Sequence, residues 1–380
     1  MKIGILTQPL LNNYGGLLQC FALQTILKRL GHETWVVQRC FEEPNHNIFW
    51  HIFYYIRQFV KVLVGRKFVR LNPTNKLDYV KRNTKHFVNE YINPKTDIIT
   101  TKEQLKKCHL VEGFDTYVVG SDQVWRPIYS PCITNYFLDF LSPQDKVKRI
   151  AYAASFGVDE WEFSEEDTSI CKDLLKLFDG VSVREKSATF LCSNFLERDD
   201  ALHVLDPTML LEKEDYICIV EKENESKSPG NLFCYILDES SEKKQVIETI
   251  ANQIDAVPFT QMPKCKLTYE NLRDRLEDCV YPSVTAWLRA FMDADMVVTD
   301  SFHGCVFSII FNKPFWAIGN KGRGLARFNS LLSIFELQNR LIDIDNIPSD
   351  SLSPIDWDKV NAKRKEWQET SMSFLKINLC

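Results

Sequence analysis

The sequence lacks the cysteine patterns of disulfide-rich and zinc-binding proteins. Its 12 cysteines are scattered, with no CxxC pair and no Cys/His cluster at the spacing of a zinc site. The N-terminal segment, Met1 to Leu6, has the form of a short strand rather than of a signal peptide, because its apolar run stops at Gln8 and Pro9. Scattered thiols and a missing signal peptide predict reduced cysteines in a cytoplasmic protein.

The sequence also lacks the motifs of several ligand classes. No GxGxxG follows the first strand, so a nucleotide cofactor is not indicated. Asp293-Ala294-Asp295 has the spelling of a metal-binding DxD, but it ends a predicted helix before an apolar strand, where helix capping is the simpler role. No internal repeat and no recognised nucleic-acid-binding motif is visible. We therefore expect no bound cofactor, no required metal and no nucleic-acid partner.

What is present is the composition of a globular protein large enough for two domains. The chain has 380 residues, of which 45% are hydrophobic. Predicted strands alternate with predicted helices, which indicates parallel sheets wrapped on both faces. The strands are expected at Lys2 to Leu6, Thr34 to Val37, Thr116 to Val119, Arg149 to Ala153, Gly180 to Val183, His203 to Leu205, Leu232 to Leu237, Val257 to Thr260, Met296 to Thr299 and Phe315 to Ile318. Between them, helices are expected at Gly16 to Leu30, Glu165 to Phe178, Arg184 to Ser193, Glu242 to Ile254, Thr285 to Asp293, Gly304 to Phe311 and Leu325 to Phe335.

The strand pattern falls into two halves that we expect to be separate α/β domains. The breaker Leu205-Asp206-Pro207-Thr208 marks the crossing between them. The predicted domains are residues 1–205 and 206–345, and a final helix, Trp357 to Leu375 within 346–380, is placed to pack back across both. Two Rossmann-like parallel-sheet domains that face each other across a cleft form the glycosyltransferase-B-like arrangement, and such a cleft is a usual substrate site.

Charge is spread unevenly along the chain. The net charge is −5, yet the segment from Pro44 to His86 carries nine Lys/Arg against one acid, so it is +8 and the remainder is −13. Its first half has apolar residues at helical spacing, interrupted by Arg57 and Lys61, which argues against a transmembrane span. We expect a basic helical insertion at about 45–92. It either engages an anionic membrane surface or packs its apolar face on its own domain with the charges solvated.

The most informative stretch runs from Val297 to Gly304 and continues into an apolar helix. It places Asp300, Ser301 and His303 in a polar turn between a buried strand and that helix. In open α/β folds this turn lies at the carboxyl edge of the sheet, where ligands bind and the helix N-terminus favours anions. An imidazole there can transfer a proton near neutral pH. The alternative is that His303 only caps or packs the helix start.

Two similar turns occur in the first half. Gly120-Ser121-Asp122 directly follows a strand, and Asp122 is either a base for a sugar hydroxyl or a helix cap. Trp125 is either a platform for a sugar ring or a core residue. Asn13-Tyr14-Gly15-Gly16 opens the first helix, where glycines let the backbone approach a ligand closely.

These motifs together resemble the polysaccharide pyruvyl transferase family. The similar residues run in family order from Gly4 to about Leu341, and each motif alone is weak whereas the ordered series is specific. They are Asn13 to Gly16 with Leu18-Gln19, Tyr117 to Trp125, Ala151 to Gly157, Val181 to Glu185, Leu205 to Thr208, Thr299 to Gly304, Lys313-Pro314 and Gly319-Asn320. The resemblance implies transfer of a pyruvyl group from phosphoenolpyruvate to two hydroxyls of a sugar in a surface or exopolysaccharide precursor. The products are a cyclic ketal and phosphate.

The resemblance also implies roles for individual residues. Arg184 matches the family arginine that holds the donor's charged end, and His303 matches the family histidine before glycine. Some members carry arginine where this chain has Ser301, so donor affinity is expected to rest on other cations, with Lys321, Arg323 and Arg327 as candidates. The predicted catalytic residues are therefore His303 and Asp122, the donor site is Arg184, Ser301, Gly304, Arg323 and Arg327, and the acceptor site is Asn13, Tyr14, Ser121 and Trp125.

Two other functions stay open at this point. The same scaffold also serves glycosyltransferases that use sugar nucleotides, because fold does not fix chemistry. A non-catalytic, glycan-binding relative is the second alternative, which Ser301 in place of arginine allows. The expected partners are phosphoenolpyruvate and a free or lipid-linked glycan, with peripheral contact to an anionic membrane face through the basic segment.

Overall fold

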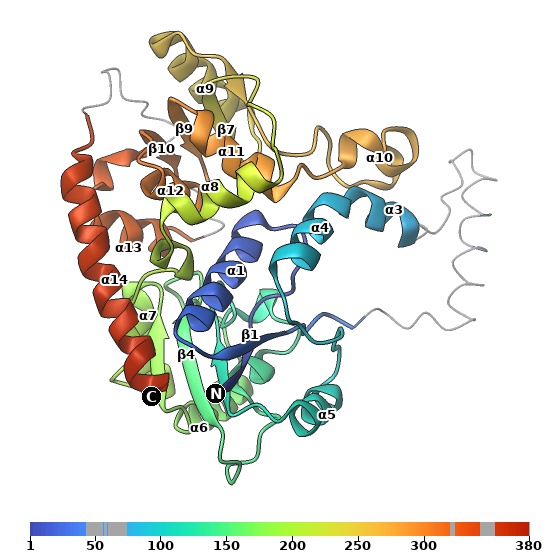
Figure 1. Cartoon of the computed structure of the whole chain (residues 1–380), viewed down its shortest axis with the longest axis vertical. Helices are drawn as coiled ribbons and strands as arrows, with labels where there is room; N and C mark the ends of the chain where they lie inside the picture. Colours follow the sequence, from blue (N-terminus) through green and yellow to red (C-terminus); the bar gives the residue numbers. More distant parts are fainter. Residues whose placement is uncertain (43–55, 57–58, 60–73, 320–323, 343–353, 380) are drawn as a thin grey trace.

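The computed structural model describes residues 1–42, 56, 59, 74–319, 324–342 and 354–379. They form two α/β domains, each built on a parallel sheet, so the predicted fold class is confirmed (Figure 1). The two domains lie one above the other in Figure 1, with both chain termini on the N-terminal domain.

The N-terminal sheet has the strand order β2-β1-β3-β4-β5-β6. All its neighbours pair in parallel, and the register sets Ile3 beside Thr34 and Thr116. Its strands are β1 (Lys2–Leu6), β2 (Glu33–Val37), β3 (Thr116–Val119), β4 (Lys148–Ala154), β5 (Gly180–Val183) and β6 (Leu202–His203). Its helices are α1 (Tyr14–Arg29), α3 (Thr74–Val80), α4 (Arg82–Tyr91), α5 (Lys102–Glu112), α6 (Glu165–Leu175) and α7 (Lys186–Leu196).

The C-terminal sheet has the strand order β11-β10-β9-β7-β8, again entirely parallel. Its strands are β7 (Leu232–Tyr235), β8 (Pro258–Phe259), β9 (Met296–Thr299), β10 (Phe315–Ile318) and β11 (Leu341–Ile342). Its helices are α8 (Lys213–Lys222), α9 (Ser241–Ile254), α10 (Tyr269–Asp274), α11 (Val284–Asp293), α12 (Phe302–Ile310) and α13 (Ala326–Ile334). The sequence prediction missed α5, α8 and α10 and extended β6 to Leu205, which lies beyond the strand.

Alternating side chains of each strand explain why helices cover both faces of the sheets. Val118 of β3 packs in a cluster with α1 and α4, whereas Tyr117 and Val119 pack in another cluster with α5, α6 and α7. The first cluster continues through Met209 and Leu210 into α11 and α12 of the second domain. The two domains thus share one apolar core at their junction, which burial of apolar surface stabilises.

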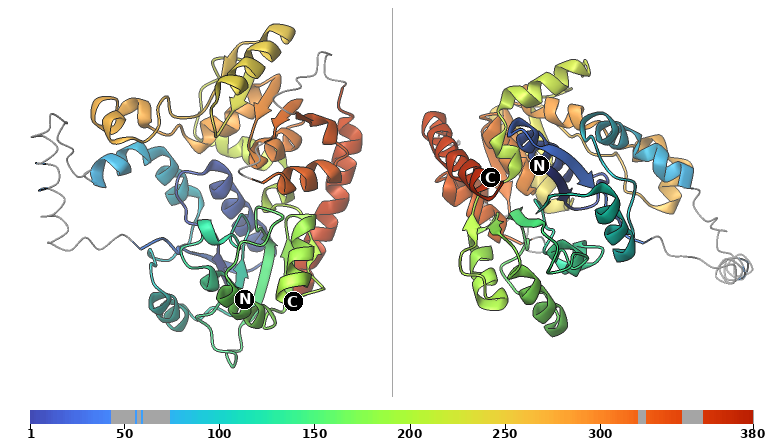
Figure 2. Two further views of the ribbon diagram at one scale, coloured as in Figure 1. Left: turned by 180° about the vertical axis from the view of Figure 1, so that it is seen from behind. Right: turned by 60° about the horizontal axis from the view of Figure 1, so that its bottom comes forward.

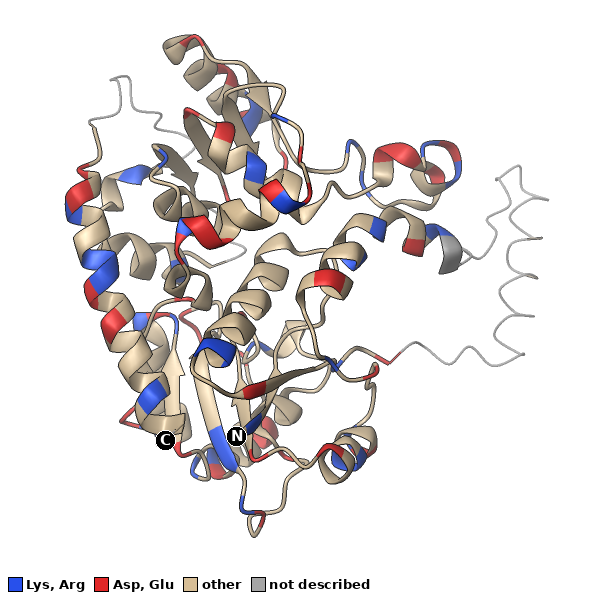
Figure 3. Cartoon of the chain, in the orientation of Figure 1, with Lys and Arg blue, Asp and Glu red and all other residues tan. Residues whose placement is uncertain are grey.

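Two further connections tie the domains together. The long helix α14 (Trp357–Leu379) runs along the outside of both domains in each view (Figures 1 and 2). Its Arg364 donates to the carbonyl oxygen of Met209, and its Ser371 hydroxyl accepts from the N–H of Leu205. On the opposite side of the molecule, α3 and α4 lie beside α10 (Figure 1). The helices on either side of this contact carry charged residues (Figure 3). In the described part of the chain, no helix is both long and apolar enough to span a bilayer.

Candidate active site

The strand orders place the predicted site turns at the sheet positions where open α/β folds bind ligands. In both sheets the connections diverge between two adjacent strands, β1 and β3 in one and β7 and β9 in the other. Ser121 and Asp122 follow β3, and Ser301 and His303 follow β9. The turn after β5 adds Arg184. The carboxyl edges of the two sheets meet here, because side chains from both domains touch one another.

Arg184 is the centre of this cluster, and its side chain is almost completely buried. Its guanidinium Nη1 donates to Oδ2 of Asp206 at 2.7 Å, and Nη2 donates to Oδ1 of Asp122 at 3.2 Å. Burial alone would lower the pKa of Arg184, but the charges of Asp206 and Asp122 raise the pKa above its ordinary value. The positive charge of Arg184, which lies just before a helix, is therefore balanced by carboxylates of the same chain.

Asp206 connects Arg184 with the predicted catalytic histidine. Its Oδ1 accepts from the N–H and hydroxyl of Thr208 at 3.0 and 2.7 Å, which fixes the carboxylate plane. Its Oδ2 faces Arg184 and lies 3.5 Å from Nε2 of His303. Burial alone would raise the pKa of Asp206, but His303 and Arg184 hold the pKa well below its usual range. Asp206 is thus a buried carboxylate that is charged and lies between Arg184 and His303.

His303 lies in the first turn of α12 and reaches across to the N-terminal domain. A Cβ added at Gly15 of α1 would overlap its Nδ1, so only glycine leaves room for the imidazole there. Gly304 serves a similar purpose, because a Cβ at this position would overlap the hydroxyl of Thr299 at the end of β9. Both glycines therefore allow close backbone approach around one imidazole. Ser301 precedes the helix, and its N–H donates to the hydroxyl of Thr299 at 3.1 Å.

A second arginine, Arg327, reaches the same place from α13. The guanidinium carbon of Arg184 lies 4.4 Å from the ring centre of Phe302, and that of Arg327 lies 5.9 Å from it. Burial and the charge of Arg184 lower the pKa of Arg327 to about 10. The charge of Arg184 opposes that of Arg327, whereas the carboxylates of Glu185 and Asp122 favour it.

Glu185 is a third buried carboxyl group in the cluster. Its Oε1 accepts from the hydroxyl of Ser155 and lies 3.6 Å from Nε of Arg184. Burial raises the pKa of Glu185, although Arg184 and Ser155 oppose that rise. The cluster therefore holds carboxyl groups of opposite tendency, with Asp206 favouring the charged form and Glu185 the neutral one.

Asp122 and Ser121 are brought together with Arg184, as the sequence predicted for residues of one site. Asp122 adopts a φ of 67°, a left-handed conformation that Asp tolerates better than most residues. Ser121 is fully buried, its hydroxyl donates to the carbonyl oxygen of Ala153 at 2.9 Å, and its N–H donates to the amide oxygen of Gln19 at 3.1 Å. Ser121 thus positions the turn from inside the fold.

The other three predicted acceptor residues have structural roles in the fold. Trp125 is fully buried, stacks on Phe137 with ring centres 5.0 Å apart and donates to the carbonyl oxygen of Tyr136. It is therefore a core residue, the second of the two roles expected for it. Tyr14 is also buried, where it stacks on Trp287 and donates to the carbonyl oxygen of Pro282. Asn13 is exposed and caps α1 by accepting from the N–H of Gly16 at 3.3 Å.

Some predicted residues do not enter the cluster. Asp300 accepts from the N–H of Leu237 and pairs with the buried Lys243 at 2.6 Å, so it ties β9 to β7 and α9. Arg323 and Lys321 lie outside the described residues. Within the described ranges, no three His, Cys, Asp or Glu side chains gather as metal ligands do. The DxD spelling is also structural, because Asp293 accepts from Arg289 and from the N–H of Ser228.

Sequence reasoning missed the site roles of Asp206, Glu185, Phe302 and Gly15. Asp206 was placed in the chain break between the domains and in a family motif, but was given no role in the site. The signal that could have found it is its position, since a polar residue just after β6 lies at the same sheet edge as Asp122 and Arg184.

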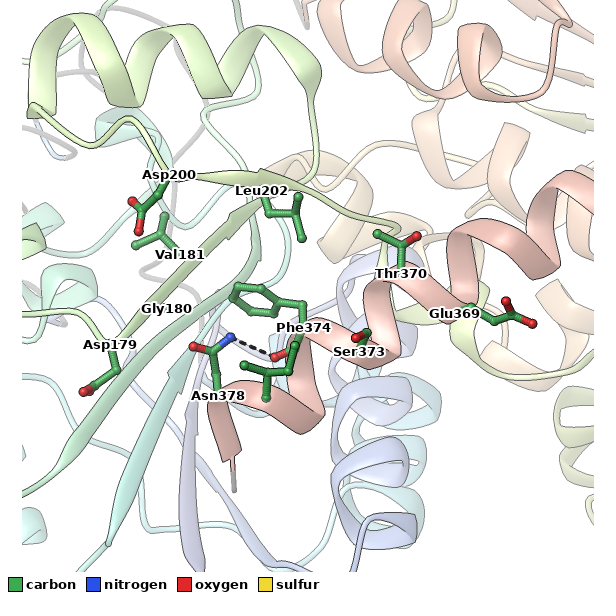
Figure 4. Close-up of a pocket in the computed structure, with 11 residues that line it drawn as sticks. Asp179, Gly180, Val181, Asp200, Leu202, Glu369, Thr370, Ser373, Phe374 and Asn378 are labelled. Atoms are coloured by element: carbon green, nitrogen blue, oxygen red, sulfur yellow. Dashed lines mark hydrogen bonds between the residues drawn. The ribbon is translucent and has the colours of Figure 1, made fainter.

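Two hollows differ in their position relative to this cluster. A groove of about 900 Å³ lies between α7, α13 and α14, and its lining residues Lys186 and Ala326 follow or precede Glu185 and Arg327 of the cluster in sequence. A second hollow of about 630 Å³ lies between β5 and α14 (Figure 4). Its residues Asp179 and Gly180 are at the start of β5, whereas Arg184 follows the end of that strand. The second hollow is therefore at the opposite edge of the sheet from the cluster.

One family model matches most of the chain. The family model of polysaccharide pyruvyl transferases matches residues 13–322. No curated protein matches the chain. Among solved structures, UDP-GlcNAc 2-epimerase from Neisseria meningitidis aligns at 10% identity with a TM-score of 0.48, over 100% of this chain and 94% of that one. The UDP-GlcNAc 2-epimerase from Methanocaldococcus jannaschii aligns at 10% identity with a TM-score of 0.48, over 97% and 93% of the two chains.

Proposed function

Because the chain belongs to the polysaccharide pyruvyl transferase family, we propose that it transfers a pyruvyl group from phosphoenolpyruvate to two hydroxyls of a sugar. The product is a cyclic ketal on a surface or exopolysaccharide precursor, and inorganic phosphate is released. The observation that carries this proposal is the convergence of Arg184, Arg327 and His303 at the junction of the two sheet edges.

The chemistry requires a proton at one carbon and charge compensation for the leaving group. One sugar oxygen attacks the central carbon of phosphoenolpyruvate while its methylene carbon gains a proton, and a second hydroxyl then closes the ketal as phosphate leaves. His303 beside Asp206 is suited to proton transfer, because the carboxylate stabilises the imidazolium. Arg184 and Arg327 supply fixed positive charge for the carboxylate and phosphate of the donor.

Asp122 is the proposed base for the sugar hydroxyl. In the structure described above, it is paired with Arg184. Substrate carboxylate or phosphate that takes over part of the Arg184 fork would release Asp122 toward the acceptor. The groove between α7, α13 and α14 offers an approach for the glycan, because it carries the hydroxyl, amide and aromatic groups that bind sugars.

The test is to incubate the protein with phosphoenolpyruvate and candidate oligosaccharides and to measure phosphate and the mass of the glycan. The expected result is phosphate release that depends on the acceptor, together with a glycan mass gain of about 70 Da, from adding pyruvic acid and losing water. Turnover of a sugar nucleotide in place of phosphoenolpyruvate would instead favour a glycosyltransferase. Glycan binding without turnover of either donor would favour a non-catalytic relative.

The acceptor is also proposed to be held at the cytoplasmic face of the membrane. The support is the +8 charge of residues 44–86 against −13 in the rest of the chain, which suits an anionic lipid surface or a lipid-diphosphate-linked glycan.

A further inference from the structure

A pair of cysteines outside the active site lies close enough to react with each other. Sγ of Cys265 is 3.3 Å from Sγ of Cys279, although the residues are 14 positions apart in sequence. The N–H of Cys265 donates to the carbonyl oxygen of Asp278 at 3.1 Å, so the backbone itself brings the two segments side by side. We propose that Cys265 and Cys279 form a redox-active pair that closes a disulfide when a peroxide or a small-molecule disulfide reaches Cys265.

The surroundings give the two thiols different roles. Cys265 is partly exposed, whereas Cys279 is fully buried beside Val80 and Leu272. An oxidant therefore meets Cys265 first, and Cys279 resolves the product. Burial and the contact with Cys265 raise the pKa of Cys279 to about 11, so the second step accelerates as the pH rises toward that value.

The reaction is balanced with either class of oxidant. Peroxide converts the Cys265 thiolate to a sulfenic acid and releases hydroxide, and the Cys279 thiolate then attacks that sulfur and displaces a second hydroxide. With a small-molecule disulfide, Cys265 first forms a mixed disulfide and releases one thiolate. Cys279 then displaces the other thiolate.

The two cysteines lie where a disulfide would restrict the unfolding of a segment at the contact between the domains. Both cysteines lie in the segment around α10 that joins the C-terminal domain to α3 and α4. The N–H of Tyr281 donates to the carbonyl oxygen of Val80 at 2.9 Å, and Lys76 donates to the carbonyl oxygen of Leu272 at 3.0 Å. A disulfide would close this segment into a loop and restrict its unfolding.

The experiment treats the native protein with hydrogen peroxide or oxidised glutathione, blocks free thiols with an alkylating agent and maps the tryptic peptides. Trypsin cleaves at Lys266, Arg273 and Arg275, so the two cysteines separate unless a disulfide joins their peptides. We expect joined peptides that are lighter by two hydrogen atoms than the sum of the free ones and that disappear after reduction.

Matched variants make the assignment specific. Cys265→Ser and Cys279→Ser should each abolish the joined peptides, while Cys218→Ser, which changes an exposed free thiol, should leave them unchanged. Oxidation of Cys265 to a stable sulfinic acid or a lasting mixed disulfide in the wild-type protein, without joined peptides, would overturn the proposal. The peptide map does not involve turnover, so it stands or falls separately from the proposed pyruvyl transfer.

Discussion

At the scale of single residues, His303 carries the sharpest prediction. Its imidazole is buried between Gly15 and Asp206. His303→Gln should therefore keep the volume and the fold but remove proton transfer, and turnover should fall on the order of a hundredfold or more. Phosphate release from phosphoenolpyruvate with a glycan acceptor measures this. His86→Gln, at an exposed histidine, is the control, and a near-normal rate for His303→Gln would refute the role.

Arg184 is predicted to stabilise the fold as well as to bind the donor. Lysine keeps the charge but cannot reach both Asp206 and Asp122, which leaves one buried carboxylate without its partner. Arg184→Lys should lower the free energy of unfolding by about 2 kcal/mol and weaken the apparent affinity for phosphoenolpyruvate. Denaturant unfolding and donor titration measure the two effects. Unchanged stability would show that the ion pairs seen here contribute little.

His203 provides a pH-dependent prediction. Its Nε2 lies 3.0 Å from the carbonyl oxygen of Arg184, and burial lowers the pKa of His203 from 6.5 to about 4. Below pH 6.5 the unfolded chain takes up a proton that the folded protein resists, so stability falls as the pH drops toward 4 and then stops falling. The loss should total about 3 kcal/mol. His203→Gln keeps a hydrogen-bond donor but does not titrate. Between pH 6.5 and 4, the free energy of unfolding of the wild-type protein should therefore fall by that amount relative to that of the variant. Parallel curves would contradict the assignment.

At the scale of elements, the N-terminus of α1 is predicted to hold the imidazole of His303 in place. A Cβ at Gly15 would overlap His303, whereas a Cβ at Gly16 would meet the Asn13 side chain at 3.4 Å, an ordinary contact. Gly15→Ala should displace the imidazole and reduce turnover by at least about tenfold, since small misplacements of catalytic groups have large effects. Gly16→Ala is the matched control and should retain most activity. Equal activity of both variants would mean that His303 can move without loss.

The elements also show how far sequence reasoning reaches. Alternation of strands and helices predicted both parallel sheets, because buried parallel strands such as Val297-Val298 are apolar throughout and end in polar turns. The same logic placed Asp122 and His303 in turns that follow strands, and the family resemblance added Arg184. It could not decide between a ligand and the core for Trp125 and Tyr14, since an aromatic residue near a turn fits both roles until its neighbours are known. Asp206 and Glu185 stood in the quoted motifs without a role, because their roles depend on pairings between segments that are distant in the sequence.

At the scale of the whole molecule, the basic segment divides into two parts. Four of its nine cations lie in the described helices α3 and α4 or between them, and several of these have partners within the protein. Arg82 lies 3.5 Å from Glu277 of the other domain, and Lys85 pairs with Asp78 at 2.6 Å. The first pair joins the two domains, whereas the second joins α3 to α4 within the segment. The proposed membrane contact must therefore rest on the cations at 57–70.

That division predicts how the protein binds lipid vesicles. Each Lys or Arg near an anionic surface contributes roughly 1 kcal/mol, so replacing Lys61, Arg66, Lys67 and Arg70 by glutamine should weaken binding to anionic vesicles by up to about a thousandfold. Added salt should release the wild-type protein, because screening shortens the reach of these charges. The control variant replaces Lys76 and Arg82, which should affect stability more than vesicle binding. Co-sedimentation at low and high salt decides: equal binding to neutral and anionic vesicles, or none to either, would mean that the segment is only a structural insertion.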